Sequence, residues 1–178
     1  MAGSLLCLVF GLTAEGCILP QNDNVIPTPS MNSAPRIVMH TPQELVTTAY
    51  VPRGASSCSS ATPGFEISVE DDDTTASDGG GYVYRDTINH RWFIDGAKTT
   101  VDGQPVRAST EPRRPVSEPS SFPTRLSEKA DDTNRHLVEV YVTDGSFGEG
   151  VDNPIPAPGQ NLAYVASFAW FVEIRTCQ

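Results

Sequence analysis

Residues 163–175 read AYVASFAWFVEIR and carry the clearest strand pattern in the sequence. Six residues, one at every second position, share one face of this stretch: Tyr164, Ala166, Phe168, Trp170, Val172 and Ile174. A period of two residues is typical of a β-strand with one buried face. We therefore expect a long, half-buried strand here.

Three earlier stretches repeat the alternation. Residues 136–145 (HLVEVYVTDG), 64–73 (GFEISVEDDD) and 82–95 (YVYRDTINHRWFID) each place apolar side chains on one face. Residues 35–42 and 44–52 are typical of short strands, or of one edge strand broken at Pro42. Residues 98–125 contain five prolines and predict a long connection, with a short edge strand near Val106. We find no helical period, so six or seven strands should form an antiparallel sandwich.

Composition narrows the classes of function. The 178 residues leave room for one ordinary domain with tails. Lys and Arg number 12 against 22 Asp and Glu, which gives a net charge of −10. Such a charge repels phosphates, so we expect neither nucleic acid binding nor docking on anionic lipid through a basic face.

The N-terminal stretch combines an apolar run with a cysteine. Residues 5–12 (LLCLVFGL) are too few to span a bilayer, and small Ala14 and Gly16 precede Cys17. This resembles the lipobox of bacterial lipoproteins, although residues 1–4 hold no Lys or Arg and Glu15 is unusual there. The resemblance implies a signal peptide at 1–16, a lipidated Cys17 and, at 17–34, a disordered tether. A plain signal peptide or a buried N-terminal strand remains an alternative.

The lipobox resemblance also bears on location. Ile18 follows the cysteine where an Asp favours retention in the inner membrane, so we expect an outer-membrane lipoprotein. The side of that membrane stays open.

This expectation assigns different fates to the four cysteines. Cys7 leaves with the signal peptide and Cys17 carries lipid, so Cys58 and Cys177 remain for the mature domain. Two cysteines in an oxidising compartment predict a disulfide bond. A metal site is the alternative, but no CxxC or His–Cys spacing supports it.

Residues 90–96 (HRWFIDG) and 136–147 (HLVEVYVTDGSF) resemble bacterial immunoglobulin-like domains of the PKD-like type. Trp92 matches the core tryptophan of those domains, and Asp144 matches the turn after their later strand. The resemblance implies an all-β, antiparallel immunoglobulin-like β-sandwich of about seven strands at 35–178, preceded by the signal segment and the tether. The inter-sheet disulfide of antibody domains has no counterpart near Trp92.

An acidic run at residues 70–73 (EDDD) is the strongest candidate for a metal site. Asp71, Asp73 and Asp78 offer the hard oxygen ligands that Ca²⁺ prefers, and Asp95 and Asp144 could reach the same end of the sandwich. The spacing does not match an EF-hand, and a solvated loop is the alternative. We expect no other cofactor.

No catalytic motif is present in the sequence. It holds no GxSxG, phosphate-binding or dinucleotide fingerprint, and His40, His90 and His136 lack zinc spacing. We expect no catalytic residues. Contacts with a partner are expected from the loops at 71–81, 98–125 and 146–161, and from four side chains: Tyr82, Tyr84, Arg113 and Arg114.

Together these observations predict a non-catalytic cell-envelope lipoprotein. It would be held in the membrane by its lipid anchor and would bind or scaffold a protein partner in the envelope. The alternative is a calcium-assisted adhesin or glycan-binding module.

Overall fold

A computed structural model describes residues 32–52, 61–76, 81–96, 100–128 and 135–177. Contacts within the chain divide it into Met1–Ser30 and Met31–Gln178, and every described residue belongs to the second unit. The expected signal peptide, Cys17 and most of the expected tether lie outside the described residues.

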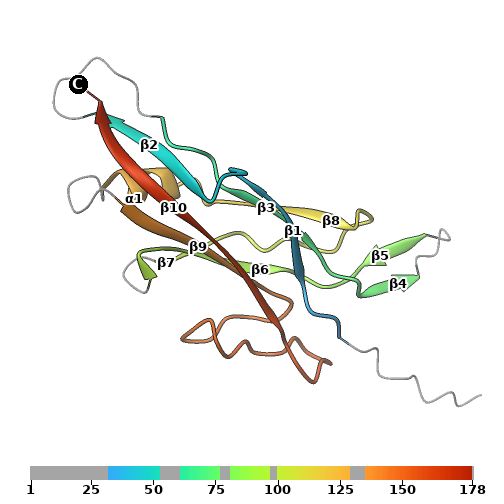
Figure 1. The fold of residues 1–178 in the computed structure, drawn as a ribbon. Coiled ribbons are helices and arrows are strands. Elements are labelled where there is room, and N and C mark those ends of the chain that lie inside the picture. Colours follow the sequence, from blue (N-terminus) through green and yellow to red (C-terminus); the bar gives the residue numbers. More distant parts are fainter. Residues whose placement is uncertain (1–31, 53–60, 77–80, 97–99, 129–134, 178) are drawn as a thin grey trace, which may run out of the picture. The chain divides into compact units, whose positions relative to one another are not determined.

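The described part is mainly β-structure with one short helix (Figure 1). The elements are β1 (Arg36–Thr41), β2 (Val46–Pro52), β3 (Glu66–Glu70), β4 (Thr74–Ala76), β5 (Tyr82–Tyr84), β6 (Asn89–Ile94), β7 (Thr100–Asp102), β8 (Arg113–Ser117), α1 (Phe122–Glu128), β9 (Arg135–Thr143) and β10 (Val165–Cys177). One sheet has the order β1-β3-β8, and a second has the order β2-β10-β9-β6-β7. A hairpin of β4 and β5 forms a third, small sheet.

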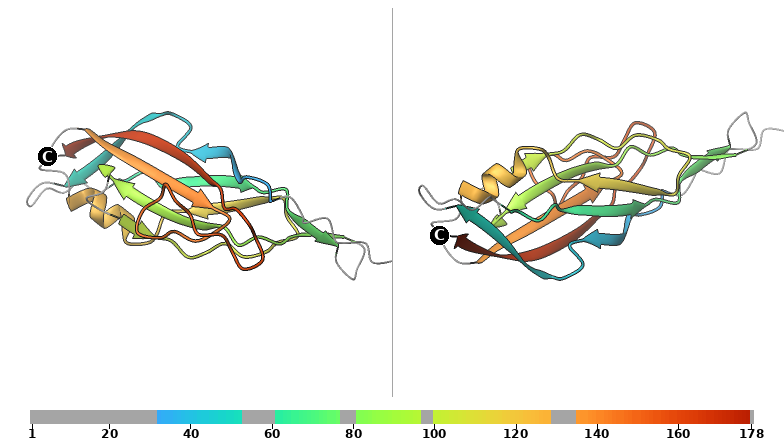
Figure 2. Two further views of the ribbon diagram at one scale, coloured as in Figure 1. Left: turned by 90° about the horizontal axis from the view of Figure 1, so that it is seen from below. Right: turned by 90° about the horizontal axis from the view of Figure 1, so that it is seen from above.

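The two larger sheets face each other and enclose the core, so the domain is sandwich-like (Figure 2). Ile67, Val69 and Val116 point inward from the first sheet, and the alternating side chains of β6, β9 and β10 point inward from the second. The rings of Trp92 and Trp170 stack at 6.1 Å, and Phe65 reaches Trp170 across the core at 5.2 Å. The alternating stretches at 64–73, 136–145 and 163–175 are confirmed as the strands β3, β9 and β10. Residues 82–95 were expected to form one strand, but they contain two, β5 and β6, which belong to different sheets.

The expectation of a wholly antiparallel sandwich is wrong for one pair of strands. β2 runs parallel to β10, with Val46 opposite Phe171 and Cys177 opposite Pro52. The chain breaks at Pro42, as expected, but its second half crosses to the other sheet. There the Trp170 Nε1–H donates to the Pro42 carbonyl at 3.0 Å and the Phe171 N–H donates to the Leu45 carbonyl at 2.8 Å.

Residues 98–125 are more ordered than a long connection. They contain β7 and β8 and the start of α1, and the bridge between Ile88 and Val106 lies near the expected edge strand. β8 is an edge strand, where Pro115 costs little because it need not donate to a further strand. Helix α1 buries only Phe122 and Leu126, and seven residues are too few to show a helical period.

One end of the sandwich receives the chain from its N-terminal side. The Asn32 side-chain amide donates to Asp144 Oδ2 at 2.6 Å and to the Leu162 carbonyl at 2.9 Å. We call this end, where β3 and β9 finish and β6 and β10 begin, the entry pole. Cys177 lies at the other end of β10.

Candidate functional site

The entry pole gathers carboxylates that lie far apart in the sequence. Asp71 and Asp73 directly follow β3, Asp86 precedes β6, and Asp144 follows β9. Because β3 ends and β6 begins at the same pole, the turns that join them bring these residues together. All four are buried.

Three of these side chains lie close enough to share one ion. Carboxylate oxygens of Asp71, Asp73 and Asp86 lie within 4.8 Å of one another. We call these three residues the carboxylate cluster.

The cluster is tied to neighbouring segments by hydrogen bonds. The Asp73 N–H donates to Asp71 Oδ1 at 3.2 Å, and the Ser33 N–H donates to Asp73 Oδ2 at 3.0 Å. The Gln160 side-chain amide donates to Asp86 Oδ2 at 2.9 Å. The cluster therefore contacts both the entering chain and the segment before β10.

Burial makes ionisation costly for these carboxyl groups. Desolvation by burial raises the pKa of Asp71 to about 6, and the nearby charges of Asp86 and Asp73 act in the same direction. Burial likewise raises the pKa of Asp86 to about 6, helped by a hydrogen bond with the Asp73 carboxyl group. The pKa of Asp144 is raised by burial as well. Carboxylates so placed favour binding either protons or a cation.

Two arginines share the entry pole with the carboxylates. Arg85 lies 3.4 Å from Asp86 Oδ1 through its Nε and 3.9 Å from Asp73 Oδ2 through its Nη2. Arg114 is buried and donates from Nη1 to the Asp86 backbone carbonyl, not to its carboxylate. The guanidinium groups therefore compensate part of the negative charge.

The structure brings two of the three expected calcium ligands together. Asp71 and Asp73 lie in the cluster, whereas Asp78 lies outside the described residues. Asp144 reaches the same pole as expected. Asp95 does not, because β6 and β9 are antiparallel and Asp95 follows the end of β6 at the opposite pole.

Sequence reasoning missed Asp86. Asp86 lies just before β6, and β6 begins at the pole where β3 ends. This position was the signal that could have indicated Asp86.

The four side chains expected to contact a partner lie in different surroundings. Tyr82 and Tyr84 lie in β5, and Tyr84 is half-buried. Arg113 is exposed and pairs with Glu70 at 2.9 Å. The alternation of β8 turns Arg114 inward, so a surface contact is wrong for Arg114, which belongs with the buried carboxylates.

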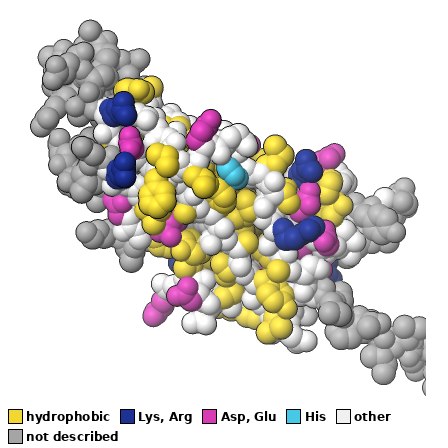
Figure 3. Space-filling model, viewed as in Figure 1, with side chains coloured by type: hydrophobic (Ala, Val, Ile, Leu, Met, Phe, Trp, Pro, Cys, Tyr) yellow, Lys and Arg dark blue, Asp and Glu magenta, His cyan; other side chains and the backbone are white. Residues whose placement is uncertain are grey.

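A shallow hollow of about 410 Å³ lies at the opposite pole, on the outer face of the larger sheet. Its lining combines the apolar residues Val46, Leu137 and Phe171 with the polar residues Asp95, Arg135 and His136. His136 Nδ1 lies 2.8 Å from Asp95 Oδ2. In Figure 3, hydrophobic side chains gather over β2 and β10 in this region.

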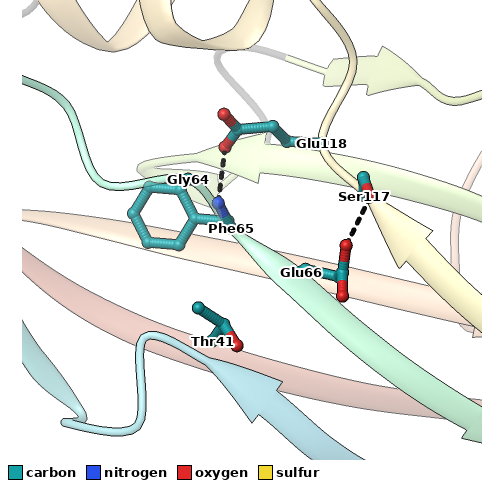
Figure 4. Close-up of a pocket in the computed structure, with 6 residues that line it drawn as sticks. All are labelled: Thr41, Gly64, Phe65, Glu66, Ser117 and Glu118. Carbon is teal, nitrogen blue, oxygen red and sulfur yellow. Dashed lines mark hydrogen bonds between the residues drawn. The ribbon is translucent and has the colours of Figure 1, made fainter.

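A second pocket, of about 310 Å³, opens between β1, β3 and β8 (Figure 4). There the Phe65 N–H donates to Glu118 Oε2 at 3.0 Å, and the Ser117 hydroxyl donates to Glu66 Oε2 at 2.9 Å. Desolvation by burial raises the pKa of Glu118 to about 7, against the opposing effect of the Phe65 hydrogen bond. Glu118 therefore binds a proton more tightly in the folded domain than in the unfolded chain.

This difference predicts a pH dependence of stability. The proton on Glu118 favours folding below pH about 4.5, and that contribution is lost as the pH rises through about 7. The free energy of unfolding of the wild type should fall between pH 5 and pH 8. In the Glu118→Gln variant this fall should be smaller by roughly 1–2 kcal/mol, a range that allows for the partial exposure of Glu118. Urea unfolding at both pH values measures this difference. The exposed Glu66→Gln in the same pocket is the control, and an equal pH response in both variants would contradict the assignment.

Comparisons with protein-family models, curated proteins and solved structures give no match to this chain. In the described residues, no helix combines the length and hydrophobicity that crossing a membrane requires. Cys58 lies outside the described residues, and Cys177 ends β10.

Proposed function

We propose that the chain is an exported lipoprotein whose immunoglobulin-like domain binds a protein partner in the cell envelope without catalysis. The lipid on Cys17 anchors it in the outer membrane, and residues 17–34 act as the tether.

The order of the strands supports an immunoglobulin-like topology. In such domains the second and fifth strands pair in one sheet, while the third, sixth and seventh form the other. Here β3 pairs with β8, and β6, β9 and β10 form consecutive neighbours in the facing sheet. Trp92 on β6 occupies the place of the core tryptophan and is fully buried. The β4–β5 hairpin then extends the connection between the second and third strands.

The observation that carries the binding role is the meeting of two long connections at the entry pole. One joins β3 to β6 and the other joins β9 to β10; the Gln160 side-chain amide of the second connection donates to Asp86 Oδ2 of the first at 2.9 Å. The second connection exposes Ile155 (53%) and Leu162 (58%). Apolar side chains displayed on loops at the end of a rigid sandwich are typical of recognition surfaces.

The tether places this surface near the membrane. Asn32 lies fifteen positions after Cys17, and a fully extended chain of that length reaches about 50 Å. Because the chain enters at the same pole that carries the contact loops, we infer a partner close to the membrane that holds the anchor. The net charge of −10 favours a protein over anionic lipid as that partner.

A disulfide between Cys58 and Cys177 is part of the proposal. Cys177 pairs in register with Pro52, and Tyr50 forms a two-way backbone bridge with Ala61. The segment that contains Cys58 therefore leaves and rejoins the structure beside the end of β10. A cross-link there would tie the segment after β2 to the end of β10.

Replacing Cys17 with serine tests the anchor. A serine accepts no diacylglyceryl group, so Cys17→Ser should shift the protein from the membrane fraction to the soluble fraction of its native host. Fractionation followed by immunoblotting measures this shift.

Cys7→Ser is the matched control, since Cys7 lies in the expected signal peptide and should leave the fractionation unchanged. A Cys17→Ser protein that still sediments with membranes, at an unchanged mobility, would refute lipid anchoring.

The second candidate is a calcium-assisted adhesin or glycan-binding module. The specific observation in its favour is the carboxylate cluster beside the contact loops. A binding surface that responds to Ca²⁺ would distinguish this candidate from the first.

A further inference from the structure

We propose that Asp71, Asp73 and Asp86 bind one divalent cation of the Ca²⁺ class at the entry pole. This site deepens the second candidate function, and it requires neither the lipid anchor nor a partner. Four features of the described residues carry it.

The spacing of the carboxylates fits the ion. Protein oxygens lie about 2.3–2.6 Å from bound Ca²⁺, so two ligands on opposite sides of the ion are separated by roughly 5 Å. The oxygens of the cluster, within 4.8 Å of one another, meet this limit. Three residues from two segments would therefore hold the ion without a large rearrangement.

A buried oxygen in the cluster has no partner. Asp71 is 1% exposed, and its Oδ2 is the only carboxylate oxygen in the described part of the chain that is buried without a hydrogen bond. Its other oxygen, Oδ1, already accepts from the Asp73 N–H. An unpaired buried carboxylate oxygen is costly, and a cation bound among the three carboxylates would remove that cost.

The charge at the pole also fits a divalent cation. Four buried carboxylates, those of the cluster and Asp144, face two guanidinium groups, those of Arg85 and Arg114. When all six groups are ionised, two negative charges remain in excess. One Ca²⁺ ion neutralises them.

The bound ion would join three segments of the chain. Asp73 accepts from the Ser33 N–H, and Gln160 donates from its Nε2 to both Asp86 Oδ2 and Asn32 Oδ1. Asn32 in turn donates to Asp144. Binding at the cluster would therefore fix the entering chain and the β9–β10 connection together.

Calcium titration of the purified full chain tests the site. We expect isothermal titration with CaCl₂ to give a Kd of about 10⁻⁴–10⁻³ M, the range of extracellular calcium modules. The melting temperature should rise by about 3–10 °C between 1 mM EDTA and 10 mM CaCl₂. A melting temperature that is the same in both buffers, with no heat of binding, would overturn the proposal. That result would mean that protons and the two arginines satisfy the carboxylates.

Asp71→Asn locates the ion. The variant should bind Ca²⁺ at least tenfold more weakly than the wild type. It should stay folded in EDTA, because the substitution removes the unpaired negative charge of Asp71. Asp152→Asn, an exposed site on the β9–β10 connection, is the control and should bind as the wild type does. Wild-type affinity in Asp71→Asn would overturn this ligand set. The titration of the wild type decides whether Ca²⁺ binds even if the variant does not fold, and neither result bears on Cys17.

Discussion

Replacing Trp170 with alanine should lower the free energy of unfolding by about 3–5 kcal/mol. Trp170 is fully buried, stacks on Trp92 at 6.1 Å and meets Phe65 from the facing sheet. Its indole N–H also donates to the Pro42 carbonyl, at the point where the chain crosses between sheets. Truncation would leave a cavity in the core and remove one of two hydrogen bonds to the Pro42 carbonyl, which also lies 2.8 Å from His40 Nδ1.

The neighbouring Phe171 provides the control for this prediction. It points to the outer face and is 53% exposed, so Phe171→Ala should cost less than about 1 kcal/mol. Trp170→Phe keeps most of the apolar volume but loses the hydrogen bond to Pro42, and should fall between the two. Urea unfolding of all three variants measures the differences. Equal losses in Trp170→Ala and Phe171→Ala would mean that β10 does not present alternate faces to the core and to solvent.

Removing the proposed disulfide bond between Cys58 and Cys177 should be comparably damaging, with a cost of about 2–5 kcal/mol. Such a bond would close a loop of about 120 residues, and the chain-entropy model assigns the largest effects to long loops. Urea unfolding with and without a thiol reductant measures this contribution. The reductant should destabilise the wild type and leave Cys177→Ala unaffected.

Cys177→Ala, which cannot form the bond, controls for nonspecific effects of the reductant. A wild type whose stability does not change on reduction would show that the two cysteines are not joined. The prediction is specific to these two positions because Cys7 and Cys17 have other expected fates.

Strands with one continuously buried face could be predicted from the sequence. β3, β6, β9 and β10 each alternate over several residues because one side packs on the core and the other faces solvent. The break at Pro42 was also visible. The parallel pairing of β2 with β10 was not, because it depends on contacts between Pro42, Leu45 and the distant residues Trp170 and Phe171.

Two elements were hidden by their composition. β8 reads RRPVS, and its buried Arg114 looks like a surface residue in the sequence. Only the burial of the carboxylates beside it explains why a charged group points inward. Helix α1 contributes Phe122 and Leu126 to the core, and two apolar positions do not define a period.

Only part of the carboxylate cluster could be predicted, because its members are not neighbours in the sequence. Asp71 and Asp73 are neighbours in an acidic run, whereas Asp86 joins them only after the β4–β5 hairpin has returned the chain to the same pole. Asp95 looked equivalent to Asp144 because both follow an alternating strand. The antiparallel pairing of β6 with β9 places them at opposite ends.

The mass of the intact protein, purified from the membranes of its native host, tests the central proposal of an exported and lipid-anchored domain. We predict a chain that begins at Cys17, carries a diacylglyceryl group there, and is about 2 Da lighter than its reduced form. A chain that keeps Met1, carries no lipid and has free thiols at Cys58 and Cys177 would contradict the proposal.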